Sequence, residues 1–444
     1  MGGAPTEDGE AGSSGPLGRV LARLFGGEAD VVRDRVFQVL LLGSVISPMG
    51  SSVVSPVLES LASPYGVSVA RVGLLMAAFT APSIVAIPLV GALSDRVGRR
   101  PVLAAGLALL GVAGGAAALT TDFRVVVALR LVQGVGYCGI GPMLIASVGD
   151  LYGGEREATA QGLRFATVGL SLALFPVLAG LLVTRDFRLP FLLFLLGLPV
   201  ALVVLRVFDE PTASGADGDQ DAPAATDNAD SEDGSGTLLA LLRDPLVLAV
   251  LAGRAVPSFL WFAFLTYASV VTGRLLESSA EVAGLLVGLA SLGSAVGGTQ
   301  VGRLTAAVDG RGLPLAATMA VCGAGLAVFG LAPSLPVAAV GAAVAGAGFG
   351  TVLTLYRSTV TGLADARARG GLVSVGESVG RVGSTAAPLA LGALVAAGGP
   401  LVGFETALRA VLVGTAVLGA TVGIGLGLLT GRAHRRANGS GSSW

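Results

Sequence analysis

The sequence predicts an all-α membrane protein in which 12 transmembrane helices form two pseudo-symmetric six-helix bundles. Three observations support this fold class. Of the 444 residues, 53% are hydrophobic and only 13% are charged, with a mean hydropathy of +0.80. Apolar stretches of roughly 20 residues, the length that a helix needs to cross a bilayer, recur along the chain. Short motifs also repeat at a spacing of about 212 residues.

The apolar stretches define the spans in order. The first six are expected at residues 36–60, 70–93, 101–120, 123–149, 159–184 and 189–207. The second six are expected at residues 244–272, 281–304, 313–332, 335–360, 370–398 and 404–430. The 68 Gly residues suit packed membrane helices, because small residues let helix backbones approach closely.

Polar segments divide these spans into domains. Residues 209–243 form a linker whose first part carries Asp and Glu repeatedly but no Arg, and we expect a solvated acidic spacer on the cytoplasmic side. This linker separates an N-terminal bundle at 36–208 from a C-terminal bundle at 244–431. Residues 1–35 and 432–444 are expected to be polar cytoplasmic tails.

The distribution of Arg predicts the orientation in the membrane. All 28 basic residues are Arg. If both termini are cytoplasmic, most of them fall at the cytoplasmic face, as the positive-inside bias requires. The Arg residues left outside are Arg71, Arg124, Arg185, Arg188, Arg274 and Arg409. The absence of Lys, together with Asp-rich tails and loops, resembles the residue usage of extremely halophilic archaea.

Internal repeats indicate a duplication of six helices. Gly134 and Gly136 in span four match Gly346 and Gly348 in span ten. In spans five and eleven, the matching residues are Pro176 with Gly180 and Pro388 with Gly392. A constant offset across several segments favours two halves with parallel topology.

A compact charged loop follows the second predicted span. It reads GALSDRVGRRP over residues 91–101, and this segment holds Gly91, Leu93, Asp95, Arg96, Gly98, Arg99 and Arg100 at fixed offsets. A basic cytoplasmic loop is expected in any multi-span protein. The complete pattern resembles the signature loop between spans two and three of the major facilitator superfamily, and the resemblance implies a secondary transporter.

The resemblance also implies roles for this loop. In the family, its acid holds the two halves together in the outward-facing state, which assigns Asp95 as the gate acid. The loop Arg, here Arg99, would reach an acid at the cytoplasmic end of span four, for which Asp150 is the match. Residues 302–311 of the second half have no acid at the place of Asp95, so we expect the halves to differ at the gate.

Span four carries a second signature, RLVQGVG at residues 130–136. A charge in hydrocarbon is unfavourable by about 2.5–3.5 kcal/mol on insertion scales, so Arg130 should face the bundle interior or water. The segment resembles a family motif in which the equivalent Arg is linked to proton coupling. A structural Arg bonded to nearby carbonyls is the alternative. Gln133 should lie on the same helix face.

The second half holds three more charges within spans: Arg254, Glu377 and Arg381. Glu377 and Arg381 are four residues apart on one helix face and could neutralise one another. Glu377 is also the acid placed deepest within a predicted span, which makes it the candidate for a titrating coupling group.

Span five carries part of an antiporter motif. Gly162, Pro176 and Gly180 fit the Gly-rich, helix-bending motif of the family's antiporters, whereas Ser171, Phe175 and Ala179 replace three of its glycines. Pro176 and its counterpart Pro388 should each bend their helix, because Pro lacks the backbone N–H. The partial match weakens the indication of export.

Further candidates for contact with substrate are polar and aromatic residues in the spans: Tyr137, Trp261, Tyr267 and Gln300. Aromatic residues would suit an amphipathic compound, whereas convergence of Arg130 and Arg254 would suit an anion. Packing is the alternative role of the aromatic rings. No cofactor and no metal site are predicted, because Cys138, Cys322 and His434 form no cluster.

The predicted function is secondary active transport of a small solute by alternating access, with ion-coupled export of amphipathic drugs or metabolites as the leading form. The alternatives are uptake of an organic anion or nutrient, and a membrane sensor or scaffold that does not transport. An enzyme and a nucleic-acid-binding protein are not expected. The expected partners are a small-molecule substrate, a coupling proton or sodium ion and the lipid bilayer around a monomer in the cytoplasmic membrane.

Overall fold

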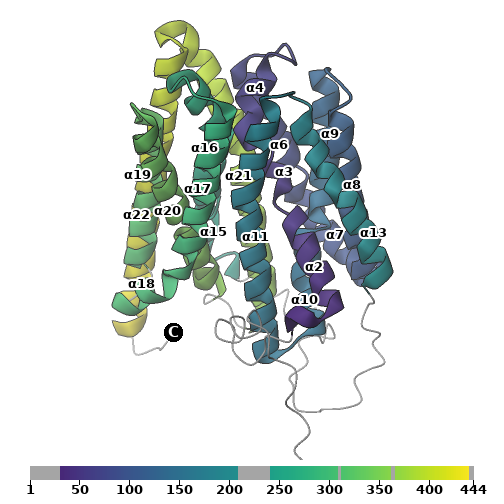
Figure 1. Ribbon diagram of the computed structural model, residues 1–444. Helices are drawn as coiled ribbons and strands as arrows, with labels where there is room; N and C mark the ends of the chain where they lie inside the picture. The colour runs from purple at the N-terminus through teal and green to yellow at the C-terminus, as the bar shows by residue number, and fades with distance from the viewer. Residues whose placement is uncertain (1–30, 209–240, 309–311, 362–365, 440–444) are drawn as a thin grey trace, which may run out of the picture.

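The computed structural model describes residues 31–208, 241–308, 312–361 and 366–439, and within them it is all-helical (Figure 1). Twelve helical segments are long and apolar enough to cross a membrane, which confirms the predicted number of spans. Most boundaries lie within a few residues of those expected. Span five is longer at its start, since it begins at Gly154. Val31 is buried and Arg35 begins the first span, while residues 1–30 of the expected tail lie outside the described residues.

The first six spans are built from short helices as well as long ones. They comprise α2 (Arg35–Ile46), α3 (Met49–Ser52), η2 (Ser55–Val57), α4 (Leu58–Ala62), α5 (Val69–Val72), α6 (Leu74–Thr80), α7 (Ser83–Val97), α8 (Arg99–Ala117), α9 (Phe123–Cys138), α10 (Gly141–Leu151), α11 (Gly154–Val183), α12 (Leu189–Leu192), η3 (Leu193–Leu196) and α13 (Gly197–Val207). Pro48, Pro56 and Pro82 lie beside breaks in the first two spans, as expected for a residue without a backbone N–H.

The last six spans contain longer uninterrupted helices. They comprise α15 (Pro245–Gly253), α16 (Ala255–Val270), η4 (Val271–Leu275), α17 (Ala280–Thr299), α18 (Val301–Ala307), α19 (Gly312–Leu331), α20 (Leu335–Thr361), α21 (Ala366–Val402) and α22 (Phe404–Gly439). Residues 209–240, which hold most of the predicted acidic linker, lie outside the described residues.

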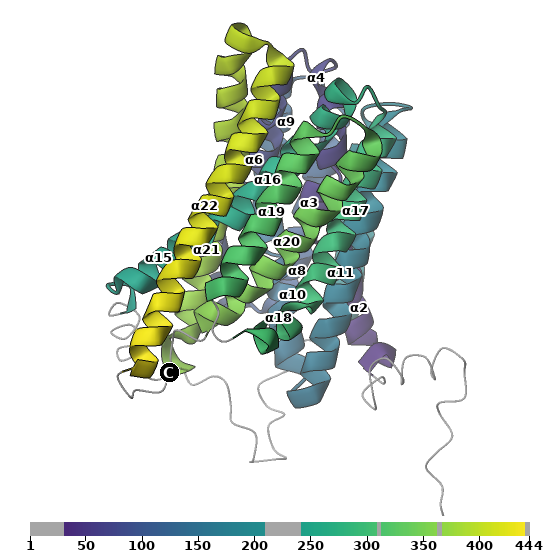
Figure 2. The same ribbon diagram turned by 90° about the vertical axis from the view of Figure 1, so that its left-hand side faces the viewer.

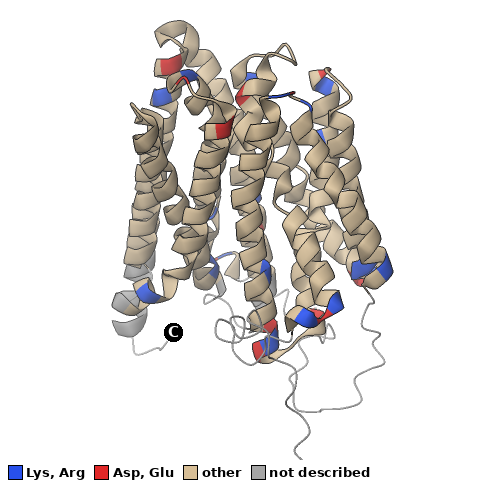
Figure 3. Ribbon diagram, in the orientation of Figure 1, with Lys and Arg blue, Asp and Glu red and all other residues tan. Residues whose placement is uncertain are grey.

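The spans run roughly parallel, so the molecule has two ends (Figures 1 and 2). We call the end where α2 begins and α22 finishes the terminal face, and the opposite end the far face. Charged residues gather at both ends and leave a largely uncharged band between them (Figure 3). This pattern is the one expected of a chain that spans a bilayer, because a charge is least stable at the membrane centre.

Two seams join the first six spans to the last six. In one, α11 packs against α17, and in the other, α21 packs against α5 and α6. A Cβ atom on Gly284 would lie 2.3 Å from the carbonyl oxygen of Pro176, and one on Gly392 would lie 2.7 Å from that of Ala70. Only glycine permits these backbones to approach so closely.

Close packing also repeats within each set of six spans. A Cβ atom on Gly134 would lie 2.3 Å from the carbonyl oxygen of Phe79, and one on the matching Gly346 would lie 1.9 Å from that of Ala290. Spans four and two therefore approach each other as spans ten and eight do. The residues that repeat in the sequence thus occupy equivalent contacts in the fold.

The packing predicts that Gly346→Ala destabilises the protein by about 1–3 kcal/mol, because an added methyl group would overlap backbone atoms of α17. Thermal unfolding of the purified protein in detergent measures this effect. Gly162→Ala is the matched control, since no atom lies within 4 Å of its Cβ position. Equal stability of the two variants would contradict the close approach.

Candidate functional site

The charged loop of residues 91–101 forms an ion-pair network on the terminal face. Gly91, Leu93, Asp95 and Arg96 lie in the last turns of α7, and Gly98 separates this helix from α8 with a φ of +94°, a conformation that favours glycine. Arg99 Nη1 lies 2.6 Å from both Asp95 Oδ1 and Ser94 Oγ, and its Nε lies 3.2 Å from Asp150 Oδ2. Arg100 donates to the carbonyl of Leu205.

The Arg99 contacts include the one that the resemblance implies, between the loop Arg and Asp150. Asp95 and Arg99 both belong to the first half, so this network holds the loop against spans three and four. The part that the resemblance gives to Asp95 in joining the two halves stays a prediction.

A second polar contact reinforces the same corner of the terminal face. Tyr152, which follows α10, donates its hydroxyl to the carboxylate of Asp34, and its ring packs edge-on against Phe37. Burial, followed by this hydrogen bond, raises the pKa of Tyr152, so the phenol keeps its proton at neutral pH. The start of the first span is thereby tied to the end of the fourth.

Arg130 is fully buried within the first half. Its Nε donates to the carbonyl of Leu75 at 3.0 Å, Nη2 donates to that of Gly50 at 2.6 Å, and Nη1 donates to Gln133 Oε1 at 2.9 Å. The guanidinium also lies 4.6 Å from the ring centroid of Phe79. All three nitrogens therefore have partners, as in the structural alternative for this residue. Arg130 and Arg254 do not converge on a common partner, because Arg254 pairs with Glu377.

Glu377 bridges two arginines of other spans and forms no direct ion pair with Arg381, the local pair that was one of the alternatives. Its Oε2 lies 3.3 Å from Arg254 Nη2 and its Oε1 lies 3.0 Å from Arg357 Nε. Arg381 points across to the first half, where its Nη2 lies 3.3 Å from Tyr137 Oη and its guanidinium 5.3 Å from the Tyr137 ring centroid. Helical spacing allows a contact between residues four apart, but partners from other spans displaced it here.

Other candidates lie in different environments. Trp261 stacks on Phe349 with ring centroids 4.6 Å apart, and Tyr267 is buried, so both rings pack inside the second half. Gln300 lies at the junction of α17 and α18, where its Oε1 accepts from Arg303 Nη1 at 3.1 Å. None of these three lies against the Glu377 cluster through a contact that the structure shows.

The proline positions lie along the seams between the two halves. Pro176 is inside α11 and Pro388 inside α21, and both helices continue through them. The carbonyl of Pro176 faces Gly284, while Gly180 lies against the carbonyl of Ala280. On the other seam, Pro388 lies 3.5 Å from the Cβ position of Gly73. Gly162, by contrast, has open space around it.

The far face is closed by contacts between spans one and seven. Ser55 Oγ donates to the carbonyl of Leu265 at 2.5 Å, the backbone N–H of Glu59 donates to Ser269 Oγ at 3.2 Å, and Arg274 Nε lies 2.9 Å from Glu59 Oε1. Deeper in the bundle, Thr385 Oγ1 lies 2.9 Å from Thr80 Oγ1. We call the set Ser55, Glu59, Leu265, Ser269 and Arg274 the far-face latch.

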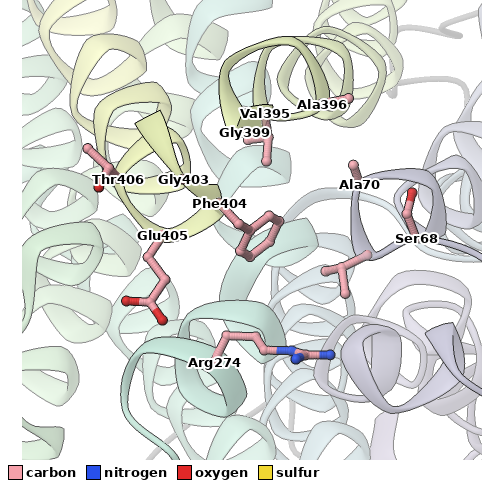
Figure 4. Close-up of a pocket in the computed structure, with 11 residues that line it drawn as sticks. Ser68, Ala70, Arg274, Val395, Ala396, Gly399, Gly403, Phe404, Glu405 and Thr406 are labelled. Carbon is pink, nitrogen blue, oxygen red and sulfur yellow. The ribbon is translucent and has the colours of Figure 1, made fainter. Parts of the chain in front are cut away.

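A cavity of about 840 Å³ lies beside this latch (Figure 4). It is formed by the starts of α5 and α22 and by the far-face parts of α21 and η4, and its labelled side chains include Arg274, Phe404 and Glu405. None of the residues predicted from the sequence to contact substrate lines it.

Sequence reasoning missed Arg357, which pairs with Glu377, and Arg164, whose charge lies near that of Arg357. Both were assigned to the cytoplasmic face because they lie near the ends of spans. Both residues lie inside predicted spans, 159–184 and 335–360, and this position could have identified them as charges within the bundle. The latch residues Glu59 and Arg274 were missed because a contact between spans one and seven leaves no local pattern.

Several curated proteins resemble parts of this chain. It is 30% identical over 162 residues to the bacillibactin exporter of Bacillus subtilis, covering 34% of this chain and 40% of that protein. It is 35% identical over 120 residues to the class C tetracycline resistance protein of Escherichia coli, covering 27% and 30%. The quinolone resistance protein NorA of Staphylococcus aureus is 25% identical over 171 residues, covering 38% and 44%.

These alignments span less than half the length of each relative. All three organisms are bacteria, so the relatives give the expected haloarchaeal origin no support.

Solved transporters share the whole fold. A bacterial homologue of the human lysosomal transporter Spinster, in an inward-facing and unoccupied conformation, superimposes with a TM-score of 0.75 at 17% identity and covers 89% of this chain and 97% of its own. The nucleoside transporter NupG gives a TM-score of 0.74 at 10% identity, with coverage of 88% and 100%. At these identities the likeness shows the fold. The family model of the Major Facilitator Superfamily matches residues 40–388, and the chain therefore belongs to this superfamily of membrane transporters.

Proposed function

We propose that this secondary transporter exports small amphipathic compounds across the cytoplasmic membrane in exchange for a proton or a sodium ion. The observation that carries the proposal is the similarity to an exporter and two drug-resistance proteins, as their names describe them. The alternating-access fold supports it, because a cargo can be taken up from one face and released at the other.

The conformation of the protein is consistent with loading from the terminal face. The latch joins spans one and seven at the far face. On the terminal-face side of the Arg381–Tyr137 contact, the side chains of Arg357 and Glu377 are 48% and 30% exposed. Most Arg residues lie in the segments that the sequence places on the side of the two termini. The positive-inside bias therefore favours a cytoplasmic terminal face.

Release at the far face would require the latch to open and the terminal face to close. At the terminal face, Arg99 forms ion pairs with both Asp95 and Asp150 in the present conformation. We propose that the Asp95 pair breaks when this face closes. Closure would draw Asp95 toward the start of span eleven, as the family resemblance implies. The two conformations would then have different ion pairs and different free energies. Cargo that binds one conformation more tightly would shift the equilibrium toward it.

Uptake of an organic anion is the second candidate function. It is favoured by the group of arginines around Glu377 and by the incomplete antiporter motif in span five. The two candidates differ in the direction of coupled flux, so a vesicle experiment separates them.

The direct test is transport into proteoliposomes that carry an imposed proton or sodium gradient, with amphipathic cations and small amphipathic carboxylates as cargo. Export by exchange predicts that cargo accumulates in vesicles loaded with acid or with sodium. This result does not depend on which way the protein has inserted. Accumulation of a carboxylate in alkaline vesicles in acid medium would instead indicate symport and contradict the export proposal.

We expect Asp95→Asn to slow transport about tenfold, because loss of the carboxylate changes the balance between gate states by an energy in the usual range of conformational coupling. Initial flux at saturating cargo measures the change, and thermal unfolding checks that the variant is folded. Asp122→Asn is the matched control, since Asn also serves as an N-cap for α9. Unchanged flux in Asp95→Asn would remove the residue from the mechanism.

Glu377 is the proposed coupling group, because the other described acids of the spans lie in the first or last turn of a span. Glu377→Gln should leave cargo exchange between vesicle compartments intact and abolish its acceleration by the ion gradient. Glu155→Gln, an exposed change at the start of α11, provides the comparison. Full gradient dependence in Glu377→Gln would show that the residue serves the ion pairs alone.

A further inference from the structure

Three arginines of the second half lie around the Glu377 carboxylate, and a fourth arginine, from the first half, lies near one of them. Arg254 lies at the break between α15 and α16, Arg357 on α20 and Arg381 on α21, while Arg164 comes from α11 of the first half. Glu377 pairs directly with Arg254 and Arg357. Arg254 also donates from Nη1 to Ser258 Oγ at 2.7 Å.

The cluster has more positive than negative charge. Arg164 and Arg357 are close enough for their charges to repel, and so are Arg254, Arg357 and Arg381. Among the described residues, the ion pairs supply one carboxylate to these four guanidinium groups. Charges within a membrane span are unfavourable unless a partner of opposite sign or water compensates them. The excess therefore indicates a site that accepts a further negative charge.

Two buried polar groups of this region lack partners. Arg164 is 4% exposed, and its Nη2 is buried without a hydrogen-bond acceptor, although its Nε donates to Gln161 Oε1 at 3.0 Å. The Tyr356 hydroxyl is buried and unpartnered as well, beside a cavity of about 10 Å³ that Arg254, Arg357 and Glu377 also line and that has room for about one water molecule. Buried donors are almost always satisfied in proteins, so the unused Arg164 Nη2 marks a place where a ligand can accept a hydrogen bond.

Arg130 shows what a structural arginine looks like in the same protein. Its three nitrogens donate to two backbone carbonyls and to Gln133. Arg164 has no comparable set of carbonyl acceptors, and its guanidinium rests 4.4 Å from the Phe165 ring centroid. The same residue type is thus used in two ways, and only the cluster leaves hydrogen-bonding capacity free.

We infer that this cluster binds the acidic group of an organic anion, a carboxylate, sulfonate or phosphate monoester, and that Arg164 and Arg357 donate to it. The inference rests on the proposed transport function and gives its cargo a charge. The rings of Phe165 and Tyr137, each beside an arginine, offer contact to an apolar part of the cargo.

In this arrangement Glu377 occupies the site in place of cargo. An entering anion competes with the Glu377 carboxylate for Arg357, and it reaches Arg164 on the other half at the same time. Binding therefore links α11 of the first half with α20 of the second. A ligand that contacts both halves favours the conformation in which they are closest, which is how cargo can drive the transition.

Thermal unfolding of the purified full-length protein in detergent tests the inference without any need for transport. The probes are 2-naphthoate, naphthalene-2-sulfonate and phenyl phosphate at millimolar concentration, with 2-naphthyltrimethylammonium as the cation of similar shape. The variants are Arg164→Gln, Arg357→Gln and Glu377→Gln. Arg409→Gln is the matched control, because Arg409 contacts the carbonyl of Gly330 on spans that do not form the cluster.

At least one anion should raise the Tm of the wild-type protein and of Arg409→Gln. Arg164→Gln and Arg357→Gln should weaken its binding tenfold or more, about 1.4 kcal/mol, and Glu377→Gln should strengthen binding severalfold. Without any probe, Arg164→Gln should raise the Tm, because it removes an unpartnered charge next to Arg357. A purely structural Arg164 would give the opposite change.

Equal anion stabilisation of the wild type and both Arg variants would overturn the inference. So would stabilisation by the ammonium compound alone, or no stabilisation by any anion. The outcome is separable from the export proposal: anion binding with symport into alkaline vesicles would retain this site and reject export. Exchange of cations without anion binding would retain export and reject this site.

Discussion

The close approach of glycine to backbone carbonyls across the two seams is the contact on which the rest of the structure depends. At Gly284 and Gly392, a side chain would overlap a carbonyl of the other half. In a bilayer, apolar side chains gain little from leaving lipid, so helices associate mainly through such tight packing. The seams bring spans five and eight together on one side and spans eleven and two on the other. The latch between spans one and seven is a further contact between the halves.

The two halves repeat one another in their glycine packing but differ in the positions of their charged residues. Repeated glycines make equivalent contacts in spans four and ten, so packing follows the duplication. The charges do not follow it. Asp95, Arg99 and Asp150 form a network on the first half alone, whereas Glu377 and its arginines are concentrated in the second. The ion-pair network and the arginine cluster therefore do not share the internal repeat that the packing follows.

Buried arginines divide into two kinds in this protein. Arg130 is saturated by carbonyls and an amide, which lets a charge sit inside the first half without any ligand. Arg164 keeps a buried nitrogen unused, and Arg357 shares Glu377 with Arg254. A buried donor with a partner keeps its hydrogen-bond energy in the folded state. A buried donor without one carries an uncompensated desolvation penalty, which a new acceptor would remove. Arg130 and Arg164 thus differ in hydrogen bonding, because only Arg130 has a partner for each of its three nitrogens.

The sequence by itself determined the twelve spans and the charged loop, because hydropathy, span length and the Gly98 turn are local properties that need no distant partner. It also indicated Arg99 with Asp150 through a family resemblance. Only the tertiary structure decided that Glu377 forms ion pairs with Arg254 and Arg357 rather than with Arg381, and that Arg164 lies near Arg357. Helical spacing shows which neighbours a side chain can reach within its own span. Partners from other spans compete for the same charge, and their positions are set by packing between segments more than a hundred residues apart, as for Arg254 and Glu377.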